Sequence, residues 1–208
     1  MTTVAGLVLA AGGGRRMGTP KALVRDDDGA AWLPRATGLL TAAGCDPVLV
    51  TLGPEAEAAA GLLPPGGVAV VEVPRWREGL GESLRSGLLA LARLAPGASA
   101  VLVSLVDLPD LRLEAATRVL GAGGDPDGSV LRQAGYAGRP GHPVLIGRRH
   151  WAPLADELSG DAGARAYLRT HGAEAVDCTD LGGGDDVDTP AGLARAGRAG
   201  ARPGRIRR

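Results

Sequence analysis

The stretch Leu7–Val24, LVLAAGGGRRMGTPKALV, joins an apolar strand pattern to a loop with three consecutive glycines. Two familiar phosphate-binding loops fail on spacing. The dinucleotide fingerprint has glycines at relative positions one, three and six, but counting from Gly12 the sixth position is Met17. The Walker loop ends in Gly-Lys followed by Ser or Thr, whereas Gly18 is followed by Thr-Pro-Lys-Ala. The loop therefore belongs to neither class.

The residue types of this loop still suit it to a polyphosphate. Because Gly12–Gly14 have no Cβ atoms, their backbone can approach a ligand closely and point N–H groups at an anion. Arg15, Arg16 and Lys21 add positive charge, and Lys21 is the only lysine in a chain that otherwise uses arginine. A lysine ammonium is more compact than a guanidinium, so its presence at position 21 indicates a tight site. The alternative is a plain strand-to-helix turn with solvated arginines.

Composition limits the possible classes of protein. A chain of 208 residues is long enough for one well-buried core. We expect one domain over residues 1–198 and a basic, disordered tail over residues 199–208. The 23 basic and 23 acidic side chains balance, which argues against nucleic acid or a membrane surface as partner. Cys45 and Cys178 lack metal-ligand spacing, and the sequence shows neither a secretory leader nor a membrane span. A cytoplasmic enzyme or binding protein is expected.

Apolar runs alternate with helix-like segments along the chain. Runs such as VLVTL and AVLVSLV are apolar at nearly every position, as in parallel strands covered on both faces. The expected strands are Val4–Leu9, Pro47–Leu52, Val68–Val73, Ala100–Val106, Ser129–Gln133 and Pro143–Ile146. The expected helices are Trp32–Ala43, Pro54–Leu63, Leu80–Leu94, Leu111–Leu120 and Ala162–Thr170. This pattern predicts an open α/β sheet.

Two acidic stretches are candidates for a metal site. Ligands of open α/β sheets bind at the carboxyl ends of the strands, where Asp107 follows an apolar strand and is placed to hold Mg²⁺. The competing interpretation is that Asp107 caps the helix expected near Leu111. Asp188, in GGGDDVDTP, is either a second carboxylate ligand or the N-cap of a helix from Pro190. Spacing alone leaves both alternatives open.

Taken in order, these residues resemble a known family, the molybdenum-cofactor nucleotidyltransferases, and especially its cytidylyltransferase branch. The family pattern Leu-Ala-Ala-Gly-x-x-x-Arg-Met-Gly-x-x-Lys matches Leu9–Lys21 at every fixed position. The match places Arg16 and Lys21 on phosphate-binding residues and leaves Arg15 on a variable position. Asp107-Leu-Pro resembles the family's magnesium motif, although many members have Met or Gln at position 108.

The resemblance continues towards the C-terminus. The segment 76–87, WREGLGESLRSG, looks like the one that closes over base and ribose, with Ser83 as its polar contact. Segments 138–148 and 160–165 look like the acceptor-side loops of the cytidylyltransferase branch. Their implied acceptor-binding residues are His142, Asp161 and Arg165. For His142 a binding role is favoured over loop fixation, without acid–base work. Asp-Val-Asp-Thr-Pro at 186–190 matches a terminal motif whose second Asp, Asp188, is a candidate metal ligand.

The resemblance implies a Rossmann-like, three-layer α/β/α nucleotidyltransferase fold with a mostly parallel sheet. It implies Mg²⁺-dependent transfer of a nucleoside monophosphate from an NTP to a phosphorylated acceptor, with Arg16, Lys21 and Asp107 as catalytic residues. Asp107 and Asp188 would hold the metal. The implied nucleotide contacts are Leu9, Ala10, Ala11, Gly12, Gly13, Gly14, Arg16, Lys21 and Ser83. Ala11 favours CTP, because guanylyl-transferring relatives usually have Gly there, and the acceptor-side segments favour molybdopterin.

Other functions remain open at this point. A guanylyltransferase, or a sugar- or alcohol-phosphate nucleotidyltransferase, would share the same fold. A non-catalytic nucleotide-binding accessory protein for a molybdenum enzyme is a different class, and the intact trio of Arg16, Lys21 and Asp107 argues against it. An oxidoreductase on a dinucleotide fold is disfavoured by the glycine spacing.

Overall fold

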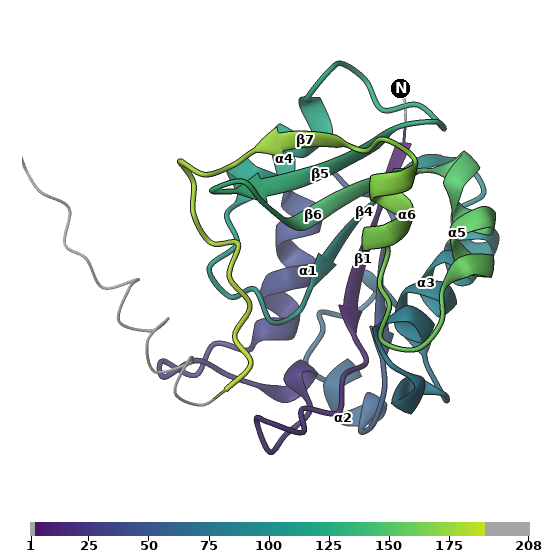
Figure 1. Ribbon diagram of the computed structural model, residues 1–208. Helices are drawn as coiled ribbons and strands as arrows, with labels where there is room; N and C mark the ends of the chain where they lie inside the picture. Colours follow the sequence, from purple (N-terminus) through teal and green to yellow (C-terminus); the bar gives the residue numbers. More distant parts are fainter. Residues whose placement is uncertain (1–2, 190–208) are drawn as a thin grey trace, which may run out of the picture.

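The computed structural model describes residues 3–189, which fold into one seven-stranded sheet covered by helices (Figure 1). The sheet order is β3-β2-β1-β4-β6-β5-β7. Only β6 runs antiparallel to its neighbours among these strands. The strands are β1 (Thr3–Ala10), β2 (Val48–Leu52), β3 (Val68–Glu72), β4 (Ala98–Leu105), β5 (Leu131–Tyr136), β6 (Arg139–Gly147) and β7 (Glu174–Asp177). The mostly parallel sheet expected from the sequence is confirmed.

Helices cover both faces of the sheet, which makes three layers (Figure 1). The α-helices are α1 (Trp32–Ala42), α2 (Ala56–Ala60), α3 (Leu80–Leu94), α4 (Leu113–Gly121), α5 (Trp151–Glu157) and α6 (Arg165–Thr170). Short 3₁₀ helices are η1 (Lys21–Leu23), η2 (Trp76–Glu78) and η3 (Arg148–His150). Alternate residues of β1 point to opposite faces: Val8 joins the core under α1 and α4, while Leu7 joins the core under α3, α5 and α6. No described helix is long and apolar enough to cross a membrane.

Several boundaries differ from the sequence predictions for local reasons. The helix expected over Pro54–Leu63 is only α2, because Glu55 before it has a left-handed φ of 58°. The edge strand β7 and helix α5 were not predicted; β7 buries one residue of four, so it has no apolar run to detect. The alternative role of Asp107, as the cap of a helix near Leu111, is wrong. Helix α4 begins at Leu113, and its N-cap residue is Arg112, which makes no side-chain cap hydrogen bond.

The sheet topology brings two predicted motifs together. β1 and β4 are parallel neighbours, with Leu9 opposite Leu105. The glycine loop follows β1 and Asp107 follows β4, so both lie beyond the carboxyl ends of these two strands, whose arrows point downwards in Figure 1. The helix expected from Pro190 and the basic tail over residues 199–208 lie outside the described residues.

Candidate active site

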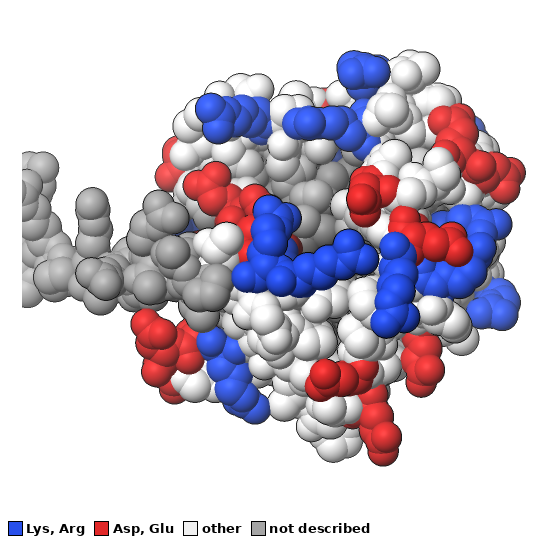
Figure 2. Space-filling model, turned by 60° about the horizontal axis from the view of Figure 1, so that its bottom comes forward, with Lys and Arg blue, Asp and Glu red and all other residues white. Residues whose placement is uncertain are grey.

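A cavity of about 470 Å³ opens at the carboxyl edge of β1 and β4. In Figure 2 this edge is turned towards the reader, and basic side chains meet acidic ones beside a hollow near its centre. Both Asp107 and Asp188 line the cavity. The residues predicted to contact the nucleotide all line it too: Leu9, Ala10, Ala11, Gly12, Gly13, Gly14, Arg16, Lys21 and Ser83.

The three loop glycines serve different purposes. Gly14 has a φ of +62°, and a Cβ there would lie 1.6 Å from the Thr19 carbonyl oxygen. A Cβ on Gly13 would lie 2.5 Å from the ring of Trp76, which lines the same cavity. By contrast, a Cβ on Gly12 would meet nothing within 4 Å. Gly14 is therefore required by the backbone of the loop, whereas Gly13 packs against the far end of the Trp76 side chain and Gly12 leaves room at the cavity wall.

Lys21 lies between two carboxylates rather than at the glycine loop. Its Nζ donates to Asp107 Oδ2 and to Asp188 Oδ1. Burial lowers the pKa of Lys21, but the attraction of these carboxylates outweighs it and the net shift is upward. Arg16 Nη2 lies 2.8 Å from Asp188 Oδ2, and the Arg16 side chain is 71% exposed. Both predicted phosphate-binding cations thus contact the predicted metal ligands.

Asp107 is a buried carboxylate, and one of its two oxygens has no hydrogen-bond partner among the described residues. Burial raises its pKa against the opposing effect of Lys21, which contacts only Oδ2. Its Oδ1 is buried and has no hydrogen-bond partner within residues 3–189. Because buried polar atoms in folded proteins nearly always have a partner, this oxygen points to a ligand of the site.

A third carboxylate, which the sequence interpretation left without a role, completes the acidic cluster. Ligand oxygens of Asp107, Asp186 and Asp188 all lie within 4.8 Å of one another. An ion at the centre of such a triangle would lie at most roughly 2.8 Å from each oxygen, so the carboxylates would have to move closer together to reach the roughly 2.1 Å that Mg²⁺ requires. The backbone N–H of Val187 donates to the Asp107 carbonyl oxygen at 2.9 Å and holds the two segments together. The sequence reasoning missed Asp186, although its Asp-x-Asp spacing with Asp188 is a signal that could have indicated it.

The predicted acceptor residues lie in two adjoining cavities. Asp161 lines the first cavity. His142 and Arg165 line a second one of about 240 Å³, which shares Leu9 and Leu80 with the first. Burial lowers the pKa of His142 to about 4, against the opposing effect of Asp186, so the imidazole is neutral at pH 7. His142 and Arg165 therefore come together, while Asp161 lies on the glycine-loop side.

Known proteins resemble this chain over most of its length. The family model of the MobA-like NTP transferase domain matches residues 6–176. Nicotine blue oxidoreductase from Paenarthrobacter nicotinovorans is 33% identical over 196 residues, which cover 89% of this chain and 92% of the relative. The crystal structure of Rv0371c from Mycobacterium tuberculosis H37Rv is 32% identical, with a TM-score of 0.77, over 95% of this chain and 98% of that one.

Two further structures bear on the metal and on the fold. A complex of Rv0371c with manganese is 31% identical, with a TM-score of 0.69, over 93% of this chain and 97% of that one. The molybdopterin-guanine dinucleotide biosynthesis protein A from Archaeoglobus fulgidus shares the fold, with 16% identity and a TM-score of 0.66 over 95% of this chain and 99% of that one. The chain therefore belongs to the MobA-like NTP transferase family, a family of nucleotidyltransferases.

Proposed function

We propose that this protein transfers a nucleoside monophosphate from an NTP to the phosphate of an acceptor and releases pyrophosphate. The favoured nucleotide is CTP, from which CMP is transferred. Molybdopterin is the leading acceptor, and a molybdenum enzyme would then receive the product. One observation carries the proposal: the glycine loop, two cationic side chains and three carboxylates converge on one cavity. Phosphoryl-type transfer needs little more than such positioning and charge compensation.

The chemistry follows from this geometry. An oxygen of the acceptor phosphate attacks the α-phosphorus and forms a new P–O bond. The bond from the α-phosphorus to the bridging oxygen breaks, and its electron pair leaves with pyrophosphate. Arg16, Lys21 and the N–H groups of Gly12–Gly14 offset the negative charge that grows on this leaving group. For that role Lys21 exchanges its carboxylate partners for phosphate oxygens.

The acidic cluster fits a divalent cation, for which we propose Mg²⁺. Carboxylates of Asp107, Asp186 and Asp188 would hold it, since Mg²⁺ takes oxygen ligands and is usually bound through carboxylates together with substrate phosphates. Bound there, the cation would supply charge neutralisation at the α-phosphate. The unpaired Asp107 Oδ1 supports this assignment, because such an ion would give that buried oxygen a partner.

The preference for CTP rests on Ala11, which is buried in the cavity wall. Its carbonyl is packed closely: a Cβ on Gly53 would lie 2.2 Å from this oxygen, so the backbone at position 11 is held in place. The methyl group of Ala11 is the feature that distinguishes this chain from guanylyl-transferring relatives, which usually have Gly at that position. Ala11→Gly should shift the preference from CTP towards GTP.

The test is pyrophosphate release from CTP, GTP, ATP and UTP with Mg²⁺, in the presence and absence of molybdopterin. We expect release with CTP only when molybdopterin is present. If GTP is used preferentially, the related guanylyltransferase is the correct function; if only a sugar or alcohol phosphate accepts, the acceptor assignment is wrong. Tight CTP binding without release from any acceptor would instead support the non-catalytic accessory protein.

A second candidate, an oxidoreductase, is favoured by the 33% identical relative named nicotine blue oxidoreductase. The glycine spacing of Gly12, Gly14 and Met17 still argues against a conventional dinucleotide site. Titration with NADH and NADPH separates the two functions. Binding or oxidation of either dinucleotide, without pyrophosphate release from any NTP, would replace the transferase proposal.

A further inference from the structure

A cavity of about 630 Å³ beside the candidate active site gathers three arginines. Arg139 comes from the turn into β6, while Arg165 and Arg169 come from α6. We call it the arginine pocket. Small or apolar residues make up much of its remaining lining: Ala134, Pro140, Leu168, Ala173 and Ala175. The pocket thus combines a non-polar surface with guanidinium groups.

The positive charge of this pocket exceeds its negative charge, since the lining has three arginines and one aspartate, Asp177. Arg139, Arg165 and Arg169 take part in none of the ion pairs between residues 3 and 189. The one acidic residue in the lining, Asp177, accepts hydrogen bonds from Thr179 N at 2.9 Å and from Thr179 Oγ1 at 2.5 Å.

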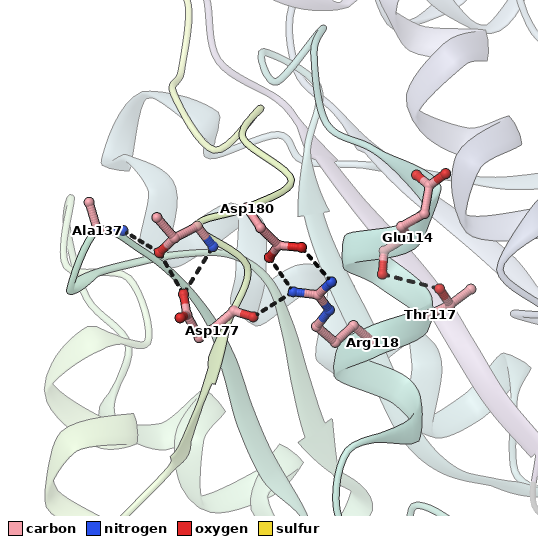
Figure 3. A network of polar contacts seen from close by, with 7 residues as sticks. Glu114, Thr117, Arg118, Ala137, Asp177 and Asp180 are labelled. Carbon is pink, nitrogen blue, oxygen red and sulfur yellow. Dashed lines mark hydrogen bonds and ion pairs between the residues drawn. The ribbon is translucent and has the colours of Figure 1, made fainter.

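The other acids near the pocket are engaged as well. The Asp180 carboxylate accepts hydrogen bonds from both terminal nitrogens of Arg118, at 2.5 and 3.0 Å (Figure 3). The backbone carbonyl of Asp177 accepts a further hydrogen bond from Arg118 at 2.9 Å. Glu174 lies 3.2 Å from Arg132. Asp177, Asp180 and Glu174 therefore form their hydrogen bonds and ion pairs with residues other than the three pocket arginines. The guanidinium groups of those arginines remain available for an anion from outside the chain.

The arginine pocket adjoins the route from the active site. The cavity that contains His142 shares Gln133, Pro140, Arg165 and Leu168 with it, and shares Leu9 and Leu80 with the glycine-loop cavity. The intervening lining includes Val144 and Ile146 of β6. The three cavities therefore adjoin one another in order, from the cavity that contains Asp107 to the arginine pocket.

We propose that Arg139, Arg165 and Arg169 bind a second anionic group, a phosphate or carboxylate, at the end of the acceptor remote from the phosphate that reacts. This inference rests on the proposed transferase function and departs from molybdopterin, whose single phosphate is the reacting one: it favours acceptors with an apolar middle and a second anionic group remote from that phosphate. Guanidinium groups suit this task because they bind phosphate and carboxylate oxygens in pairs.

A binding measurement tests the pocket without any turnover. The probe is 1-naphthyl phosphate, followed by its fluorescence in protein that is saturated with CTP and freed of divalent metal, and 1-naphthol is the uncharged control. In the double variant Arg139→Ala/Arg169→Ala the Kd for the phosphate should rise at least about tenfold. The matched control, Arg93→Ala, replaces an exposed arginine of α3 outside the pocket lining and should leave the Kd unchanged. An unchanged Kd in the double variant would overturn the proposal.

Steady-state kinetics then test whether the acceptor itself supplies the anion. Phosphorylated acceptors are compared with and without a second phosphate or carboxylate. The double variant should lose the KM advantage of the dianionic acceptors at unchanged kcat. If it keeps that advantage while 1-naphthyl phosphate binding is lost, the pocket binds free anions and the acceptor assignment is wrong. Failure of every acceptor would refute the proposed function instead, and the binding measurement would still decide the pocket.

Discussion

Replacing Asp107 by Asn should abolish tight divalent-metal binding while the protein stays folded. The side chain is 10% exposed, one oxygen contacts Lys21, and the other has no described partner. Burial raises the pKa of Asp107, which means that burial disfavours its charge. A neutral amide of similar volume relieves that cost, and Lys21 keeps Asp188 as a counter-charge. We therefore expect the free energy of unfolding to change by less than about 2 kcal/mol.

The loss of metal affinity can be worked out from the geometry. Three carboxylate oxygens within 4.8 Å of one another can all face one ion. A carboxylate about 4 Å from a divalent ion contributes roughly 8 kcal/mol at an effective dielectric constant near 20, twice the value for two unit charges. Asp186 is exposed, so water screens part of the interactions within the cluster. Since about 1.4 kcal/mol corresponds to a factor of ten, the affinity should fall by at least about 10²–10³-fold.

The assay is Mn²⁺ binding without nucleotide, with free Mn²⁺ measured by electron paramagnetic resonance. Asp185→Asn is the matched control, because it removes a neighbouring exposed carboxylate outside the cluster. Asp186→Asn should weaken binding like Asp107→Asn, though less, because its carboxylate is more exposed to water. Equal Mn²⁺ affinity in Asp107→Asn and Asp185→Asn would refute the assignment of the cluster as a metal site.

Three further predictions concern the loop and His142. Lys21→Ala should lower pyrophosphate release about 10²–10³-fold in a folded protein, because it removes charge from the leaving group; turnover equal to that of Arg93→Ala would contradict this. Gly14→Ala should unfold the loop and lower the melting temperature, whereas Gly12→Ala should keep the melting temperature and weaken CTP binding; equal effects would count against the separate roles. The pKa of His142 is lowered from 6.5 to about 4 in the folded protein. Between pH 6.5 and pH 4 the imidazole is therefore protonated in the unfolded chain but neutral in the folded one. Stability should thus fall by up to about 3 kcal/mol from pH 6.5 to pH 4, and His142→Gln should flatten this decline in urea titrations.

The local sequence determined the sheet, the glycine loop and the position of Asp107. Alternating apolar strands and helical patterns predict a parallel sheet because both faces of such strands must be buried. The same reasoning places any residue after β1 or β4 at the ligand edge. The antiparallel direction of β6 and the existence of β7 were not predictable in this way. β7 exposes three of its four residues and is held by pairing with β5.

Only the tertiary structure decided how the charges of the site are arranged. The sequence indicated Lys21 and Asp107 separately, but their contact crosses 86 residues of chain. Asp186 and Asp188 follow the last described strand and belong to no helix or strand, so no periodicity places them. Their position depends on the Val187 N–H bond to the Asp107 carbonyl oxygen. Sequence thus determined which chemical groups are present, whereas long-range packing decided which of them meet, because contacts between distant segments leave no local pattern.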